Sequence, residues 1–158
     1  MSALRFYLDY VHHFLASHSR HGTHSPFVYR LVDEVIYARQ KNEEPRNKVA
    51  RLIERLIERF TPHTIYRMGN PLPSQPLDFV ITRDADGDTL ATQLRQLWPQ
   101  LHPDSLVVVN DIYRTRKMKR LWRTVQERPD VTVTIDLFHV GLVFFRTGQA
   151  KEDFRIRF

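Results

Sequence analysis

The amino-acid sequence predicts an α/β protein, in which an N-terminal cap of helices precedes an open sheet with a C-terminal antiparallel hairpin. Two observations carry this prediction. Residues 1–62 repeat apolar side chains at the spacings of amphipathic helices, whereas from residue 63 short apolar strands alternate with helices. A chain of 158 residues has the size of one domain, so we expect a single domain over residues 1–158, with a cap at 1–62 and a sheet portion at 63–158.

Three helices are expected in the cap. Ser25 and Pro26 predict the start of the second one, because serine caps free N–H groups and proline fits the first helical position. Thr61 and Pro62 end the third. The apolar face of the first helix is Leu4, Tyr7, Leu8, Val11, Phe14 and Leu15. The stripe of the second is Phe27, Val28, Leu31, Val32, Val35 and Ile36. That of the third is Val49, Leu52, Ile53, Leu56, Ile57 and Phe60.

The sheet portion begins with two strands, residues 63–69 and 77–82, that are joined without room for a helix. Asp86 and its neighbours form a turn and an N-cap, which predict a helix that runs to Pro99. The apolar run 105–110 is typical of a central parallel strand that is covered on both faces.

A strongly basic helix then precedes the predicted hairpin. Its buried stripe is Met118, Leu121, Trp122 and Val125. Residues 131–137 alternate as a strand, residues 139–141 turn the chain, and residues 141–146 return as the hairpin partner. Alternation over residues 154–158 predicts a last strand.

Composition excludes several classes of site. The chain has no cysteine, which excludes disulfides, zinc thiolates and thiol nucleophiles, and only 5 glycines, which disfavours glycine-rich ligand loops. No apolar run has the roughly 20 residues of a membrane span, and the N-terminus lacks the apolar core of a signal peptide. We therefore expect a cytoplasmic protein, and its net charge of +6 favours acidic partners.

Three segments give the sequence a family resemblance. Residues 21–29 (HGTHSPFVY), 131–146 (VTVTIDLFHVGLVFFR) and 154–158 (FRIRF) resemble bacterial S-adenosylmethionine-dependent methyltransferases, in particular a Bacteroidetes group of the class I type. The resemblance extends in order over nearly the whole chain. It implies a Rossmann-like methyltransferase sheet with helical N-terminal additions and S-adenosylmethionine as the cofactor.

The sequence departs from this family where the cofactor would bind. The resemblance implies an acidic residue and a glycine-rich loop after the first strand, but here only Gly69 fits, and the prolines of residues 70–76 follow it. The strand whose terminal acid would bind the ribose is missing, together with the next strand. Gly69, Asn110 and Asp111 are the only remnants, so we expect neither cofactor binding nor catalytic residues.

Two groups of residues could each bind a metal ion or, alternatively, serve a structural role. Asn110 and Asp111, with Asp84 or Asp86, offer oxygen ligands of the kind that Mg²⁺ prefers, although such residues also cap helices and turns. A histidine cluster offers transition-metal ligands, but no acid or cysteine lies among its last three members, which favours structural or surface roles. The cluster is His12, His13, His18, His21 and His24. Ser/His/Asp catalysis has no supporting G-x-S-x-G motif.

The basic helix over residues 114–123 is the strongest candidate for binding. Its cations could contact the phosphates of a nucleic acid, but no exposed aromatic platform accompanies them, which favours a solvated helix face. The candidate contacts are Arg116, Lys117, Lys119, Arg120 and Arg123.

Taken together, these features favour a degenerate, non-catalytic methyltransferase-like protein that acts through protein contacts. We expect it to pair with itself or with an intact methyltransferase relative, because the missing strands leave residues 64–68 as an open sheet edge. Cover of this edge by the N-terminal helices over residues 3–39 is the alternative. Two other functions remain open: an active methyltransferase with a rebuilt or partner-completed site, and a nucleic-acid-binding module.

Overall fold

The protein is described by a computed structural model over residues 3–17, 25–38, 47–83 and 85–158. Its helices are α1 (Ala3–Ala16), α2 (Pro26–Leu31), the π-helix η2 (Val32–Ile36), α3 (Lys48–Phe60), α4 (Gly87–Leu97), the 3₁₀ helix η3 (Trp98–Gln100) and α5 (Arg116–Glu127). Its strands are β1 (Ile65–Arg67), β2 (Phe79–Ile81), β3 (Leu106–Asn110), β4 (Val133–Asp136), β5 (Val140–Phe144) and β6 (Glu152–Arg155).

The described residues form one sheet of six strands in the order β1-β2-β3-β5-β4-β6. β1, β2 and β3 are parallel to one another, and β4 is parallel to β6. β5 runs antiparallel to both of its neighbours, β3 and β4. The predicted α/β class and the antiparallel hairpin of β4 and β5 are therefore confirmed.

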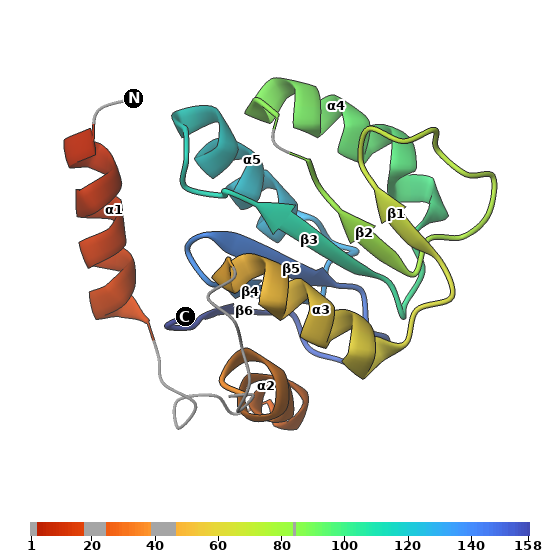
Figure 1. Ribbon diagram of the computed structural model, residues 1–158, viewed down its shortest axis with the longest axis horizontal. Coiled ribbons are helices and arrows are strands. Elements are labelled where there is room, and N and C mark those ends of the chain that lie inside the picture. The colour runs from red at the N-terminus through yellow and green to blue at the C-terminus, as the bar shows by residue number, and fades with distance from the viewer. Residues whose placement is uncertain (1–2, 18–24, 39–46, 84) are drawn as a thin grey trace.

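Helices cover both faces of this sheet, which gives three layers (Figure 1). One apolar core joins α2, η2 and α3 to the first face, and a second joins α4 and α5 to the other. β3 contributes Leu106 and Val108 to the first core and Val107 and Val109 to the second. The prediction of a central strand that is buried on both sides is thus confirmed.

α2 and α3 pack as their apolar stripes predict. Ser25 is the N-cap of α2, where its Oγ accepts the N–H of Val28 at 3.5 Å, and Thr61 ends α3 in a left-handed conformation with a φ of 42°. Every predicted member of the two stripes is buried or packs against the first core.

β1 and β2 are shorter than the predicted strands 63–69 and 77–82. Asp78 accounts for the late start of β1, because its Oδ2 accepts the backbone N–H groups of His63 and Thr64 at 2.7 and 2.9 Å. These two residues are therefore fixed by a side chain before the ladder begins at Ile65.

α5 packs against the sheet through the predicted stripe, whose four members are all buried. Trp122 lies against the backbone of β5, where a Cβ built on Gly141 would come within 2.4 Å of its ring. A glycine is required at this position because the indole occupies the space of a side chain.

α1 differs from the prediction, because its apolar face points away from the protein. Leu4, Leu8 and Leu15 are 69%, 61% and 74% exposed, whereas His13 is the buried residue of the helix. The reason is that α1 is attached through its other side, where Phe6 and Tyr10 pack against Phe138 and polar side chains form ion pairs. Asp9 pairs with Lys119 on α5, and His13 pairs with a carboxylate at the end of β4. Figure 1 shows α1 standing at the side of the sheet.

β1 is an edge strand, since its only neighbour in the sheet of the described residues is β2. The alternative that the N-terminal helices cover this edge is not supported by the described residues. α1 lies against α5 and the ends of β4 and β6, and α2 and η2 pack in the first core on a face of the sheet (Figure 1). Ile65 stays 42% exposed at the edge.

Candidate functional site

Gly69 shapes a turn just beyond the end of β1. Its φ is +101°, a left-handed conformation that favours glycine. A Cβ at this position would lie 3.0 Å from a guanidinium nitrogen of Arg83, so the side chain of Arg83 covers the turn. As the sequence predicts, no helix lies between β1 and β2, whereas the family resemblance would imply a phosphate-binding helix N-terminus at this place.

Asn110 and Asp111 hold the carboxyl ends of two strands together. The Asn110 side chain donates to the carbonyl of Thr82 at 2.7 Å, and its backbone N–H donates to Thr82 Oγ1 at 2.9 Å. Asp111 has a φ of 55° and donates its N–H to the carbonyl of His139 at 2.7 Å. Both residues of the predicted remnant therefore have structural bonds.

The carboxylates of the proposed Mg²⁺ site are also used as caps. Asp86 is the N-cap of α4, and its oxygens accept from the Asp88 N–H at 3.0 Å and from Thr89 Oγ1 at 2.6 Å. Hydrogen bonds from Thr89 and Asp88 lower the pKa of this carboxyl. Asp84 lies outside the described residues, among which no three metal-ligating side chains gather.

Two residues of the predicted histidine cluster belong to the described part of the chain, and they lie in different environments. His12 is exposed on α1 and His13 is buried, while His18, His21 and His24 lie outside the described residues. Of this cluster, His13 alone therefore enters a described buried network.

That network centres on Asp136, the last residue of β4. Asp136 Oδ1 contacts His13 Nε2 at 2.9 Å and accepts the N–H of Phe138 at 2.9 Å, while Oδ2 accepts the hydroxyl of Tyr113 at 2.8 Å. Burial, the charge of Asp136 and this hydrogen bond raise the pKa of Tyr113. The carboxylate thus joins α1, β4 and the loop before α5.

Ser17 completes a Ser/His/Asp arrangement that the sequence analysis missed. Its Oγ lies 3.1 Å from His13 Nδ1, on the opposite side of the ring from Asp136. The hydroxyl donates to the His13 carbonyl, so its proton is directed to the backbone and not to the imidazole. We assign the arrangement to structure: it attaches α1, and it does not activate a nucleophile.

The basic helix forms a shallow groove with α1. Lys117 pairs with Asp86 and Asp88 of α4, and Lys119 pairs with Asp9 of α1, so two of the five predicted cations meet carboxylates. The other three line the groove with Lys119 and with Arg5 from α1, around a cavity of about 330 Å³. The lining residues are Arg5, Arg116, Lys119, Arg120 and Arg123.

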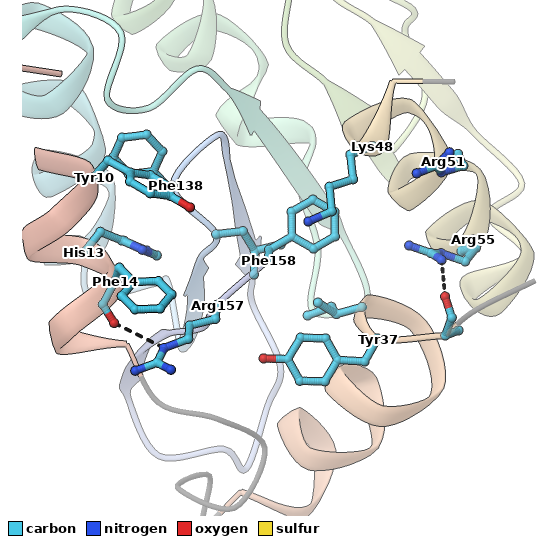
Figure 2. A pocket seen from close by; sticks show the side chains of 13 residues that line it. Tyr10, His13, Phe14, Tyr37, Lys48, Arg51, Arg55, Phe138, Arg157 and Phe158 are labelled. Atoms are coloured by element: carbon cyan, nitrogen blue, oxygen red, sulfur yellow. Dashed lines mark hydrogen bonds between the residues drawn. The ribbon is translucent and has the colours of Figure 1, made fainter. Parts of the chain in front are cut away.

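A larger cavity, of about 540 Å³, lies beyond the carboxyl ends of β4 and β6 (Figure 2). Its walls come from α1, from the end of η2, from α3 and from the residues that follow β4 and β6. Aromatic rings and cations alternate on these walls. The sequence analysis missed this site because its lining residues come from distant segments.

Comparison with family models, with curated proteins and with solved structures finds no match for this chain. Within the described part of the chain, no helix has the length and apolar character needed to cross a membrane.

Proposed function

We propose that this chain is a non-catalytic, methyltransferase-like protein that acts through protein contacts, and that the exposed face of α1 binds a second copy. The single observation that carries the proposal is the apolar face of α1, where six large side chains are between 45% and 74% exposed. These are Leu4, Tyr7, Leu8, Val11, Phe14 and Leu15.

The area of this face supports a stable contact. One aromatic side chain carries about 150–250 Å² of surface, so two aromatic and four aliphatic side chains at these exposures expose several hundred Å². A standard protein interface buries about 800 Å² on each partner, whereas the largest apolar patch of an ordinary monomer is about 300–600 Å². The α1 face therefore supplies a large part of the area that one side of a dimer needs, and it is at least as large as the largest apolar patch of an ordinary monomer.

The spacing on α1 supports a second copy as the partner. Leu4, Leu8, Val11 and Leu15 form a seam with spacings of four, three and four residues, which read the same in both directions. Two antiparallel copies would place Leu4 against Leu15 and Leu8 against Val11, in the self-complementary contact of a two-fold dimer. The buried polar attachment through His13 fixes the opposite side of the helix to the sheet.

The non-catalytic part of the proposal rests on the carboxyl ends of β1, β2 and β3. Gly69 lies under Arg83, and Asn110 is bonded to Thr82. The strand order, in which β5 is inserted antiparallel beside β3, agrees with a reduced methyltransferase-like sheet. Calorimetric titration with S-adenosylmethionine and S-adenosylhomocysteine should give no binding; a dissociation constant in the low micromolar range would favour the active enzyme instead.

Light scattering at micromolar concentration tests the contact. We expect a dimer for the native chain and a monomer for the double variant Leu8→Asp with Val11→Asp, because both charges lie at the centre of the seam. Ile65→Asp is the control, since it places a charge on the exposed edge strand β1, through which the sequence predicts pairing. It should leave the dimer intact if α1 makes the contact. A native chain that is monomeric would contradict the α1 contact. A dimer that dissociates in Ile65→Asp but not in the α1 variant would contradict it as well.

A second candidate function, nucleic-acid binding, is favoured by the groove between α1 and α5. Arg116, Arg120 and Arg123 lie on one face of α5, with Arg5 opposite them. If the groove binds phosphates, fluorescence anisotropy with a labelled single strand will show affinity that falls with salt. Arg116→Gln with Arg120→Gln should weaken it, whereas Arg95→Gln on α4 should not. Equal affinity for all of these proteins would exclude the groove.

A further inference from the structure

A cavity of about 480 Å³, which we name the α2–α3 cavity, lies between α2, the end of α3 and Arg146, which follows β5. Phe27 and Phe60 line it, and both rings contact the ring of Phe144, the last residue of β5. Phe144 pairs antiparallel with Leu106, the first residue of β3. The cavity is therefore at the amino end of β3, whereas the family resemblance implies a cofactor at the carboxyl ends of the parallel strands.

Arg146 is a partly buried cation in this cavity. Its guanidinium carbon lies 4.1 Å from the centre of the Phe27 ring, and that ring is held edge-on against Phe144 at 5.1 Å. Among the described residues, no carboxylate pairs with Arg146 and no oxygen accepts its N–H groups. A partly buried charge is costly without a counter-ion, and a planar guanidinium matches an anion that offers two oxygens.

The other two arginines of the α2–α3 cavity are placed differently. The Nε of Arg59 donates to Glu34 at 3.2 Å, so a carboxylate already balances its charge. Arg30 is exposed to solvent on α2. We therefore assign the anion to Arg146 alone. One guanidinium balances the single charge of a carboxylate, whereas a phosphate group carries about −1.5 to −2 at neutral pH.

The charges around Arg146 favour an anion in the α2–α3 cavity over the neighbouring space. Arg146 and Phe60 also line a second cavity, which contains Asp78 and Asp104. Hydrogen bonds from Thr64, His102 and His63 lower the pKa of Asp78 and keep it charged at neutral pH. An anion would be repelled there, whereas no Asp or Glu is among the described residues that line the α2–α3 cavity.

Apolar side chains form the rest of the wall. Phe27 and Leu31 of α2 and Phe60 of α3 line the cavity beside the arginines. Phe27 and Phe60 are only partly buried against the first core, so part of each ring stays accessible to a ligand. The volume of about 480 Å³ is within the range of small-molecule sites, which combine apolar walls with a few polar groups that orient the ligand.

We propose that the α2–α3 cavity binds a small carboxylic acid with an apolar body. The carboxylate lies on the guanidinium of Arg146, and the body lies against the apolar walls that α2 and α3 supply. This site is independent of the α1 contact, because no residue of α1 lines the cavity.

An NMR titration of the full chain tests the site, with 3-phenylpropionate as the probe. The backbone amide signals of residues 27–31 and of Phe60 and Arg146 should shift and saturate. 3-Phenylpropanol lacks the charge and acetate lacks the apolar body, so each should bind at least about tenfold more weakly. Equal affinity for the alcohol would overturn the role of Arg146, and equal affinity for acetate would overturn the role of the apolar walls. Shifts confined to α1, or no saturable shift, would overturn the site itself.

A pair of variants locates the carboxylate. Arg146→Gln should weaken 3-phenylpropionate at least about tenfold and leave the affinity for 3-phenylpropanol unchanged, which shows that the cavity is still formed. Arg157→Gln is the matched control, because it removes the same charge from an arginine that also lies over a phenylalanine ring, at 4.2 Å from the centre of Phe14. It should bind 3-phenylpropionate as the native chain does. Unchanged affinity in Arg146→Gln, or weaker binding only in Arg157→Gln, would contradict the assignment.

Discussion

α1 and α3 are amphipathic helices of similar length that use their apolar faces in opposite ways. α3 buries Leu52, Ile53 and Leu56 against the sheet. α1 exposes its leucines and attaches itself through His13 and Asp9. An apolar stripe thus predicts which residues share a face, but buried polar contacts can decide which face meets the protein. The exposed stripe is then available for a partner.

The largest expected effect is on stability, and it is seen by comparing one leucine substitution in α3 with one in α1. Leu56 is fully buried, so Leu56→Ala should lower the free energy of unfolding by about 2–5 kcal/mol. Leu8→Ala removes the same atoms from a side chain that is 61% exposed, and should cost under ~0.5 kcal/mol in the monomer. Urea denaturation below the dimer dissociation constant measures both. Similar losses would show that α1 packs by its apolar face after all.

The next prediction concerns the polar attachment of α1. Asp136→Ala leaves the Tyr113 hydroxyl and the Phe138 N–H without their acceptor and removes the carboxylate that pairs with His13, so it should cost about 1–3 kcal/mol. Because Asp136 contacts α1 directly through His13 and does not contact α3, hydrogen exchange should accelerate in α1 more than in α3. Uniform acceleration over both helices would mean that Asp136 stabilises the whole sheet and does not specifically hold α1.

Asp78 pairs with His102, as Asp136 pairs with His13, but the Asp78 pair is more exposed. Burial alone would raise its pKa, but hydrogen bonds from Thr64, His102 and His63 together lower it. A carboxyl whose pKa is lower in the folded state contributes stability above its unfolded value of about 3.9, and loses it as the pH falls through the folded value.

Asp78→Asn should therefore cost about 1 kcal/mol at neutral pH and much less near pH 3. Urea midpoints of the native chain and the variant, measured across this range, check the sign. A difference that grows in acid would indicate that the folded state does not favour the charged carboxylate.

The smallest effect is expected on the outer face of α5. Arg116→Glu with Arg120→Glu should change the free energy of unfolding by under ~0.5 kcal/mol, because both side chains are exposed. Trp122→Ala in the same helix should cost about 3–5 kcal/mol, since the indole is 2% exposed against β5. Thermal melting distinguishes the two, and equal shifts would contradict the assigned faces of α5.

The sequence was sufficient to predict the buried face of each element whose packing follows from its local hydrophobic pattern. The stripes of α3 and α5, the caps Ser25 and Asp86, and the central strand β3 lie as predicted. In each of these elements the apolar residues are also those that the sheet buries, so the hydrophobic period gives the right face.

The orientation of α1 and the aromatic cavity could not be obtained in this way. The partners of α1 are Lys119 and Asp136, which follow it by more than a hundred residues. The cavity likewise combines Lys48 with Arg157. Only the tertiary fold brings such residues together, and no local period records the contact. Asn110 and Asp111 lie at the carboxyl end of β3, where the sequence places them, but their bonds to Thr82 and His139 are visible only in three dimensions.

The insertion of β5 has a consequence for how the chain folds. β5 is made of residues 140–144, yet it stands between β3 and β4 in the interior of the sheet. During synthesis from the N-terminus, β3 and β4 therefore emerge before the strand that joins them. Unpaired strand edges expose N–H and C=O groups to other chains, and distant pairings are slow to form. Until β5 arrives, β3 therefore leaves one edge of the β1-β2-β3 part of the sheet unpaired, and this edge is open to other chains.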